Sequence, residues 1–426
     1  PVADIVELAA TVNGSPAALA AHPTVPFAPN RSAPGSLPPG SPSVLAGGWP
    51  PPAARRTGPP AAQDDEHLLV VSDAVREYPI TAGAVLQRKV ASLKAVSGVS
   101  FTVGRGETFG LVGESGCGKT TLGKMIVGLE KPDGGQVRLR GTDISRLSQH
   151  EMRRFRRDLQ MVFQDPIASL DPRMRVAAAL REPMRLQGVG TAREQMQVVT
   201  HLLQEVGLPA NAVERFPHEF SGGQRQRIGL ARALTLNPQV IVADEPVSAL
   251  DVSIRSQVLN LMKRLQETHG LTYVVISHDL AVVKYMSDRI GVMYLGKMVE
   301  MGSGDDIYLR PAHHYTAGLI AAVPEPDPSR ETAKRKVAIV GELPSPVNPP
   351  SGCRFRTRCP AAQPVCAELE PPLREFHPGH VAACHFPLQP PTEQGFASEA
   401  ATVGAGVGGH VGAADTDEPG AGRAPY

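Results

Sequence analysis

The stretch Gly113-Glu-Ser-Gly-Cys-Gly-Lys-Thr120 constrains the fold of this 426-residue chain more than any other feature. It follows the apolar residues 108–112 and precedes a helix-like run at 121–127. Glycines let backbone N–H groups curl around an anion, and the positive end of the following helix dipole faces the same point. The pattern G-x-x-x-x-G-K-[ST] between a strand and a helix therefore predicts a phosphate-binding loop. The residues expected to bind the nucleotide here are Gly113, Glu114, Ser115, Gly116, Cys117, Gly118, Lys119 and Thr120, together with Thr121 at the start of the helix.

An apolar, strand-like run ends in two carboxylates. Residues 240–243 are Val-Ile-Val-Ala, and Asp244 and Glu245 follow directly. Ligands of open α/β sheets bind where the strands end, so the pair is placed for chemistry at bound phosphates. Lys119 would reach the β- and γ-phosphates, and the Thr120 hydroxyl would ligate Mg²⁺. Asp244 would hold the same ion, directly or through water, and Glu245 would polarise the attacking water.

A second site for an anion is indicated by Ser221-Gly-Gly-Gln224. Ser221 is a typical helix N-cap, and Gly222 and Gly223 leave backbone amides open at the start of the helix. A helix start of this kind binds anions. The same residues would also serve as an ordinary capped helix, and on their own they do not decide between the two roles.

Charge and composition bear on the class of partner. The chain has 43 Lys and Arg against 42 Asp and Glu, and aromatic residues make up 4% of it. A near-neutral chain with few aromatic side chains is not expected to bind nucleic acid, which requires basic surfaces or stacking platforms. No run of about 18 apolar residues occurs, so no segment is predicted to span a bilayer. The first residues lack a basic stretch followed by an apolar core, and we expect residence in the cytosol.

Proline-rich and glycine-rich segments flank the folded part of the chain. Residues 1–65 are rich in Pro, Ala, Gly and Ser and are predicted to be a disordered arm or an inter-domain linker. Residues 388–426 have the same character and are predicted to be a disordered tail. Between them we expect a larger domain at 66–320, with a helical portion at about 166–236, and a smaller cysteine-bearing segment at 321–387.

Apolar runs alternate with helical patterns in the larger domain. Residues 255–268 place Val258, Leu261, Met262 and Leu265 on one helical face. Short apolar runs that suit buried parallel strands occur at 159–163, 240–243 and 273–276. Further strands are predicted at 68–72, 100–103 and 136–140. Strands that alternate with helices predict an α/β core built on a parallel sheet.

Four of the five cysteines lie in one short segment, as Cys353, Cys359, Cys366 and Cys384. In a cytosolic protein such a group favours a metal over disulfides. The spacings lack the C-x2-C pairs typical of structural zinc, and four thiolates suit an iron–sulfur cluster or zinc. Reduced thiols without a metal are the alternative. The fifth cysteine, Cys117, is expected to be a small filler in the phosphate loop.

The order of these motifs resembles that of an ATP-binding-cassette (ABC) ATPase. The phosphate loop, the Ser221-Gly-Gly-Gln224 segment and Asp244-Glu245 follow one another as in this family, and the likeness covers about 67–315. It implies the ABC cassette of the P-loop NTPase fold, with a RecA-like parallel sheet core, an antiparallel β subdomain and a helical subdomain. It also implies ATP and Mg²⁺ as cofactors, with each ATP held between two cassettes that pack head to tail.

Several residues take their expected roles from this resemblance. Gln164 matches the glutamine that contacts Mg²⁺ and the attacking water, and Asp251 lies in the loop that communicates across the dimer. His278 matches the histidine that contacts the γ-phosphate, while Ser221–Gln224 would contact the ATP of the opposite cassette. Tyr78 is the candidate to stack on adenine, with a surface strand position as its alternative. The expected catalytic residues are Glu245, His278 and Gln164.

The C-terminal part narrows the resemblance. The cysteine segment, Tyr308-Leu-Arg-Pro-Ala-His-His-Tyr315 and Ser169-Leu-Asp-Pro172 are similar to the importer ATPases for dipeptides, oligopeptides and nickel. This similarity implies a [4Fe–4S] cluster on the four cysteines in preference to zinc. It also implies a peripheral position at the cytoplasmic face of the cell membrane. The implied partners are two permease subunits, an extracytoplasmic peptide-binding protein acting indirectly, and a second cassette that is another copy, a paralogous chain or a joined domain.

Two alternatives to peptide import remain open at this point. The cargo of such importers is chosen by other subunits, so nickel or another small solute is equally compatible with these motifs. A soluble ABC ATPase of DNA repair or translation is a different class. It would need a coiled-coil insertion or a second cassette, and neither is visible in this sequence.

Overall fold

The computed structural model describes residues 67–82, 88–165, 170–323 and 339–389 of the chain. The predicted arm at 1–65 lies outside these residues, and so does the predicted tail from residue 390 on. The disorder of both segments and the domain boundaries therefore stay predictions.

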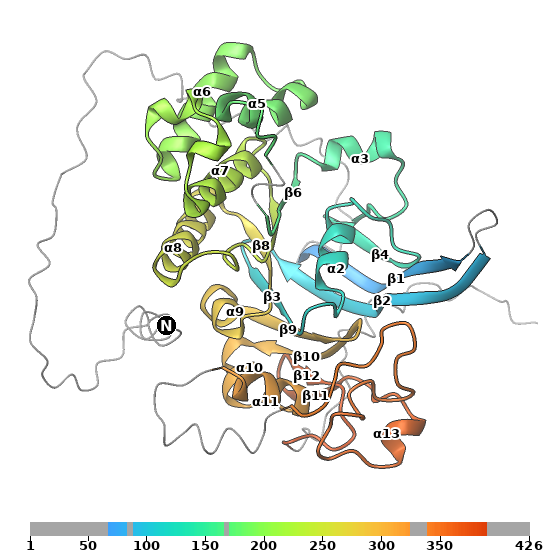
Figure 1. Ribbon diagram of the computed structural model, residues 1–426. Coiled ribbons are helices and arrows are strands. Elements are labelled where there is room, and N and C mark those ends of the chain that lie inside the picture. Colours follow the sequence, from blue (N-terminus) through green and yellow to red (C-terminus); the bar gives the residue numbers. More distant parts are fainter. Residues whose placement is uncertain (1–66, 83–87, 166–169, 324–338, 390–426) are drawn as a thin grey trace, which may run out of the picture.

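Two β-sheets form the centre of the molecule (Figure 1). Their strands are β1 His67–Ala82, β2 Arg88–Gly104, β3 Thr108–Val112, β4 Gly134–Leu139, β5 Thr142–Asp143, β6 Leu159–Val162, β7 Val240–Asp244, β8 Thr272–Ser277, β9 Arg289–Tyr294, β10 Lys297–Ser303, β11 Arg374–His377 and β12 His380–Ala382. The smaller sheet is antiparallel, in the order β2-β1-β4-β5. The larger has the order β11-β12-β10-β9-β3-β8-β7-β6, and it is parallel from β9 to β6.

Helices cover the larger sheet and rise above it (Figure 1). Their bounds are α2 Lys119–Ile126, α3 Gln149–Phe155, α5 Val176–Gln187, α6 Ala192–Glu205, α7 Gly222–Leu234, α8 Val252–His269, α9 Leu280–Met286, α10 Gly304–Leu309, α11 His314–Ala321 and α13 Val365–Glu368, with 3₁₀ turns at Ala210–Glu214 and Pro217–Glu219. Helices α5, α6 and α7 share one apolar core. In the part of the chain that the structure describes, no helix has both the length and the apolar character to cross a bilayer.

The parallel strands show why the sequence predicts them. Every residue of β3, β7 and β8 is buried, so these strands are continuous apolar runs instead of alternating ones. Helix α2 packs between the two sheets, where Leu122, Met125 and Ile126 join one cluster with residues of both. The predicted apolar face of α8 is buried as well. The predicted α/β core with a parallel sheet is thereby confirmed.

The hairpin of β1 and β2 is much longer than predicted. The sequence indicates strands only at 68–72 and 100–103, yet β1 and β2 pair from His67 with Gly104 out to Ala82 with Arg88. Several register shifts interrupt the ladder, and the outer residues are exposed or half-buried. Pairing between the two strands therefore continues where the hydrophobic alternation has already ended.

The cysteine-bearing segment adds strands to the larger sheet. Strand β12 pairs antiparallel with β10, with Glu300 opposite Ala382 and Met301 opposite Val381, and β11 pairs with β12. Figure 1 shows this segment, in orange and red, beside the ends of β9 and β10. The C-terminal residues are thus joined to the sheet that carries the phosphate loop.

A buried carboxylate fixes this junction. Glu300 on β10 is fully buried and accepts hydrogen bonds from the backbone N–H groups of Ala312 and His313, at 2.7 and 3.0 Å. Its Oε1 also lies 2.7 Å from Nε2 of His380, which is fully buried on β12. One side chain therefore joins β10, the start of α11 and the C-terminal strands.

We expect Glu300→Ala to lower the free energy of unfolding by about 3 kcal/mol or more. The substitution leaves two backbone donors and the His380 ring buried without their acceptor, and each such group costs about 1–3 kcal/mol. Thermal and denaturant unfolding followed by circular dichroism measures the loss. Glu368 is exposed on α13, so Glu368→Ala is the matched control and should change stability little. Equal stability of the two variants would contradict this assignment.

Candidate functional site

The phosphate loop lies between β3 and α2, as its sequence predicts. Its last glycine, Gly118, is the N-cap of α2 and has φ 104°, a left-handed value that favours glycine. A Cβ atom at Gly118 would collide with the backbone oxygen of Ala95, and one at Gly113 would collide with that of Met293. The glycines therefore let the loop pass closely under β2 and β9 while it curls at the start of α2.

Lys119 is buried, and its ammonium group is held by the loop itself. Nζ donates to the carbonyl oxygens of Gly113 at 2.7 Å and Glu114 at 3.0 Å. The sulfur of Cys117 lies 3.7 Å from the same nitrogen. The positive charge is thus already positioned inside the loop, where phosphate oxygens can replace the carbonyls as acceptors.

Thr120 and Asp244 provide neighbouring oxygens for a cation. The Thr120 hydroxyl donates to Oδ1 of Asp244 at 3.1 Å, and Asp244 is the buried last residue of β7. Burial raises the pKa of Asp244, and the hydrogen bond from Thr120 partly offsets this effect. A cation beside this carboxylate would favour its charged form. The pair suits Mg²⁺, which uses one or two protein oxygens together with waters and substrate phosphates.

Glu245 brings the predicted catalytic residues together. Its Oε2 accepts a hydrogen bond from Nε2 of Gln164 at 2.8 Å, and its Oε1 lies 3.0 Å from Nδ1 of His278. Gln164 follows β6, Glu245 follows β7 and His278 follows β8, which are adjacent strands of the sheet. Glu245 has φ 47°, so the backbone is left-handed for a residue that is not glycine. Three separate motifs therefore meet at one edge of the sheet.

The Ser221 segment has a structural role that is complete within the chain. Ser221 caps α7, and Gln224 completes a reciprocal capping box with it. A Cβ atom at Gly223 would collide with Ile254 of α8, so this glycine is also needed for helix packing. Ser221 and Gly222 nevertheless lie exposed at the helix start. In the described residues, no hydrogen bond or ion pair joins this segment to the phosphate loop of the same chain.

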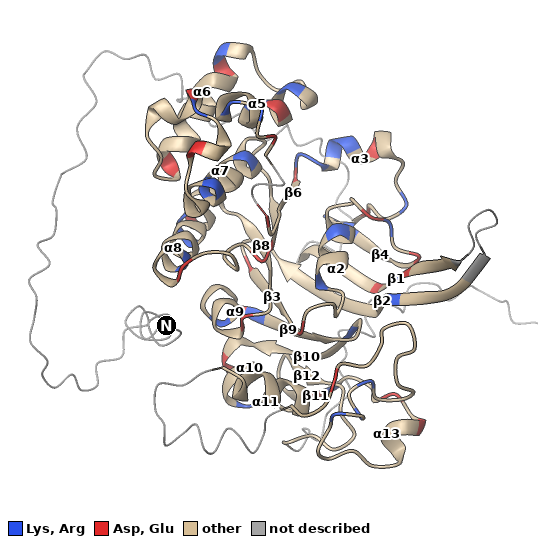
Figure 2. Ribbon diagram, in the orientation of Figure 1, with Lys and Arg blue, Asp and Glu red and all other residues tan. Residues whose placement is uncertain are grey.

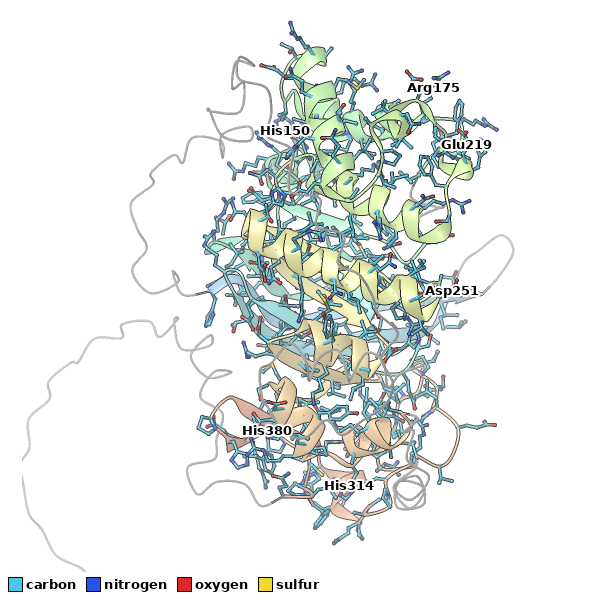
Figure 3. The ribbon with its side chains drawn as sticks, turned by 90° about the vertical axis from the view of Figure 1, so that its left-hand side faces the viewer. His150, Arg175, Glu219, Asp251, His314 and His380 are labelled. Carbon is cyan, nitrogen blue, oxygen red and sulfur yellow. The ribbon has the colours of Figure 1, made fainter. Side chains whose placement is uncertain are left out.

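Asp251 lies at the N-terminal end of α8, near the edge of the molecule (Figure 3). It is exposed, and its side chain makes no capping hydrogen bond to the helix that it precedes. Glu219, two residues before Ser221, lies toward the same edge in this view (Figure 3). The two predicted inter-cassette segments thus face outward instead of toward their own nucleotide loop.

Tyr78 lies on β1 with its ring already engaged. The Arg76 guanidinium lies 4.8 Å from the ring centroid, and the Tyr78 hydroxyl donates to Glu130, which follows α2. Burial raises the pKa of this hydroxyl most, and the hydrogen bond to Glu130 raises it further. Tyr78 is therefore close to the helix that carries the phosphate loop, while its role in adenine stacking stays a prediction.

Two contacts to the phosphate loop come from residues for which the sequence analysis predicted no role in the site. Arg358 forms a bidentate ion pair with Glu114, at 2.7 and 3.0 Å, and the Tyr315 hydroxyl accepts from the Glu114 N–H at 2.8 Å. Arg358 lies 244 positions from Glu114 in the chain. No local pattern indicates such a contact, because it depends on how the C-terminal segment folds back on the sheet.

The four clustered cysteines line one small cavity, together with His313, His314 and His385. All five cysteines of the chain are free thiols. Burial raises the pKa of Cys384 to about 12, and burial also raises the pKa of Cys353 and Cys359. Across the described residues, no group of three or more His, Cys, Asp or Glu side chains is arranged to hold a metal ion. The predicted iron–sulfur cluster is therefore not supported by the present thiol geometry.

Comparison with known proteins agrees with the geometry. Residues 96–248 match the family described as ABC transporter, and residues 299–366 match the oligopeptide/dipeptide transporter C-terminal region. The chain is 52% identical over 322 residues to the oligopeptide transport ATP-binding protein AppF of Bacillus subtilis (strain 168), covering 75% of this chain and 98% of AppF. It is 54% identical over 298 residues to the putative peptide import ATP-binding protein BOV_A0347 of Brucella ovis, covering 70% of this chain and 93% of that protein.

A solved structure shows the same fold. The ATP-binding cassette MJ0796, a dimer in a post-hydrolysis state bound to ADP and Pi, is 28% identical with a TM-score of 0.50. The match covers 55% of this chain and 98% of that one. Together with the matched regions and the relatives, this likeness confirms the predicted cassette. The chain belongs to the ABC transporter ATP-binding proteins, in the dipeptide and oligopeptide importer family.

Proposed function

We propose that this chain is the ATP-hydrolysing subunit that powers the import of oligopeptides across the cell membrane. The observation that carries the proposal is the contact of Glu245 with both Gln164 and His278, beside the pair of Thr120 and Asp244. The peptide cargo is inferred from what AppF and the Brucella protein are named for, and from the matched oligopeptide/dipeptide region.

In the proposed reaction the residues position the reacting groups and stabilise charge on the phosphates, and no covalent intermediate with the protein is formed. Lys119 would exchange its two carbonyl acceptors for oxygens of the β- and γ-phosphates. Thr120 and Asp244, with Gln164, would hold Mg²⁺, which when bound neutralises charge on the phosphates. Glu245 would orient and polarise the attacking water. His278, whose ring is half-exposed beside Glu245, would contact the γ-phosphate.

The site would be completed by a second cassette. Ser221, Gly222 and Asp251 are exposed, and among the described residues no hydrogen bond or ion pair joins them to the nucleotide loop of their own chain, so they are placed to serve another one. Ser221 and Gly222 offer the open start of α7 to an anion. The second cassette would be another copy, a paralogous chain or a joined domain, packed head to tail with this one.

A groove beside Gln164 would receive the permease subunits. It is lined by residues between α2, β6, α5 and α7, and it includes the exposed apolar side chains Leu129 and Phe163. A neighbouring hollow is lined by Leu186, which is also exposed, and by Arg153 of α3. Figure 2 shows basic residues along α3. A groove in which exposed apolar side chains lie among polar and charged ones suits a protein partner. Two permease subunits would hold this chain at the cytoplasmic face of the membrane, and an extracytoplasmic binding protein would deliver the peptide.

The cysteine cavity is the proposed place of a [4Fe–4S] cluster, with zinc as the alternative. Four thiols line it. The donor set suits a thiolate-bound metal, but the thiols would have to rearrange around it. Iron, sulfide and zinc analysis of anaerobically purified chain tests this proposal. Absence of both metals would remove it and leave reduced thiols.

Transport in the native cell tests the importer function. Cells that lack this chain would be supplied with either the native chain or Glu245→Gln, and uptake of labelled di- and oligopeptides would be compared with uptake of nickel. We expect peptide uptake to return only with the native chain. Recovery of nickel uptake alone would reassign the cargo. Unchanged uptake of both in the absence of the chain would contradict an importer function.

A further inference from the structure

Glu114, the second residue of the phosphate loop, is held at both its side chain and its backbone by residues far along the chain. Arg358 donates from Nη1 to Oε2 at 2.7 Å and from Nη2 to Oε1 at 3.0 Å. The Glu114 N–H donates to the hydroxyl of Tyr315 at 2.8 Å. The Arg358 side chain is only 8% exposed, so this pair is screened by water much less than a surface ion pair.

The groups that hold Glu114 are themselves fixed by an aromatic cluster. Tyr294, Tyr315 and Phe355 are buried, with ring centroids 4.6 to 5.4 Å apart. Phe355 comes from the C-terminal segment, three positions before Arg358, and packs edge-on against Tyr294 of β9. Arg358 also donates to the Tyr294 hydroxyl at 3.5 Å. The aromatic cluster therefore fixes the position from which the guanidinium contacts Glu114.

Glu114 connects Arg358 and the aromatic cluster to the phosphate-binding lysine. Its carbonyl oxygen accepts from the Lys119 ammonium at 3.0 Å, while its carboxylate accepts from Arg358. A shift of Glu114 would therefore move an acceptor of Lys119 and change the curl of the loop around the phosphates. A nucleotide binds more tightly to a loop that is already in its bound shape, so the ion pair would raise the affinity for the nucleotide.

We propose that Arg358 is a positioning residue of the nucleotide site, which acts through Glu114 to hold the phosphate loop in its ATP-binding shape. The C-terminal segment is then a working part of the ATPase and not only an appendage of it. This inference rests on the proposed nucleotide site and deepens it.

Arg358→Gln in the full chain tests the proposal. Equilibrium binding of a fluorescent ATP analogue should weaken about tenfold, because a bidentate charge-assisted contact is replaced by a neutral one. The KM for ATP should rise by a similar factor while kcat changes less than about twofold. The affinity of Arg358→Lys for the analogue should lie between that of the native chain and that of Arg358→Gln, because an ammonium keeps the charge but cannot form the paired contact. Melting temperatures show whether each variant is folded.

Two matched controls separate positioning from simple docking of the segment. Arg356 lies in the same segment but donates to Ser351, so Arg356→Gln removes a charge without touching the loop. Glu370 joins the segment to Lys297 of β10 at 2.7 Å, so Glu370→Gln weakens docking at another point. Both controls should bind the analogue within about twofold of the native chain.

A double-mutant cycle provides the second, independent measurement. Glu114→Gln combined with Arg358→Gln should weaken binding no more than either change alone, because both remove the same contact. Tyr315→Phe, which keeps the aromatic packing but removes the acceptor of the Glu114 N–H, should weaken binding in the same direction even if Arg358→Gln does not fold.

The outcomes distinguish this inference from the proposed function. Native affinity in Arg358→Gln and Tyr315→Phe, or additive losses in the cycle, would reduce the ion pair to a docking contact. A native chain that fails to bind the analogue would instead contradict the nucleotide site itself.

Discussion

Glu245→Gln will leave ATP bound but lower kcat by at least about 100-fold. The carboxylate of Glu245 is placed between Gln164 and His278, and an amide of the same shape retains an acceptor for Gln164 but is far too weak a base to polarise water. The substitution therefore slows the chemical step and leaves ATP binding unchanged. Phosphate release and equilibrium binding of ATP, measured on the same preparation, separate the two.

An exposed glutamate on the adjacent helix supplies the control for this result. Glu267 lies near the far end of α8, so Glu267→Gln changes the same functional group away from the site. It should hydrolyse ATP at the native rate. Hydrolysis by Glu245→Gln at more than about a tenth of the native rate would show that another group activates the water.

Lys119→Ala will lower the affinity for ATP by about 100-fold, the second large effect. The ammonium of Lys119 is buried in the loop and is the cation that is already aimed at bound phosphates. Alanine at the first position of α2 suits a helix, so the fold should survive the change. Titration with a fluorescent ATP analogue measures the loss directly, and peptide uptake in cells should stop with it.

Lys124 is the matched control for the lysine substitution. It lies on the same helix but is more exposed and faces Glu130 at 4.0 Å, away from the loop carbonyls. Lys124→Ala should bind the analogue almost as well as the native chain. If Lys119→Ala and Lys124→Ala bind equally, the loop does not recognise phosphates through this lysine.

The elements that the sequence predicts well are those whose signal is local. The strands around 240–243 and 273–276 are apolar because both their faces are buried, and the run at 159–163 is apolar apart from Gln160; the structure places each within about two residues of its expected bounds. The outer part of the hairpin of β1 and β2 gives no such signal. Its ladder is maintained by pairing across the hairpin and not by burial of alternate side chains.

The site likewise contains features that the local sequence predicts and features that it does not. The phosphate loop and the carboxylates of β7 are recognisable from their own neighbours in the chain, but their contacts depend on the strand order β3-β8-β7-β6. That order brings Gln164, Glu245 and His278 to one edge of the sheet. The contact of Arg358 with Glu114 has no local sign at all, since it follows from the return of the C-terminal segment to β10 and β9.

That return has a consequence for any shortened form of the chain. Strand β12 occupies the backbone N–H and C=O groups along one side of β10, so a chain ending before residue 374 would present that side to solvent. Bare strand edges recruit other strands, and dimers or aggregates that form through β10 are the expected result. Self-association of such a truncated ATPase would therefore report the loss of a protective cover and not the natural oligomer of the cassette.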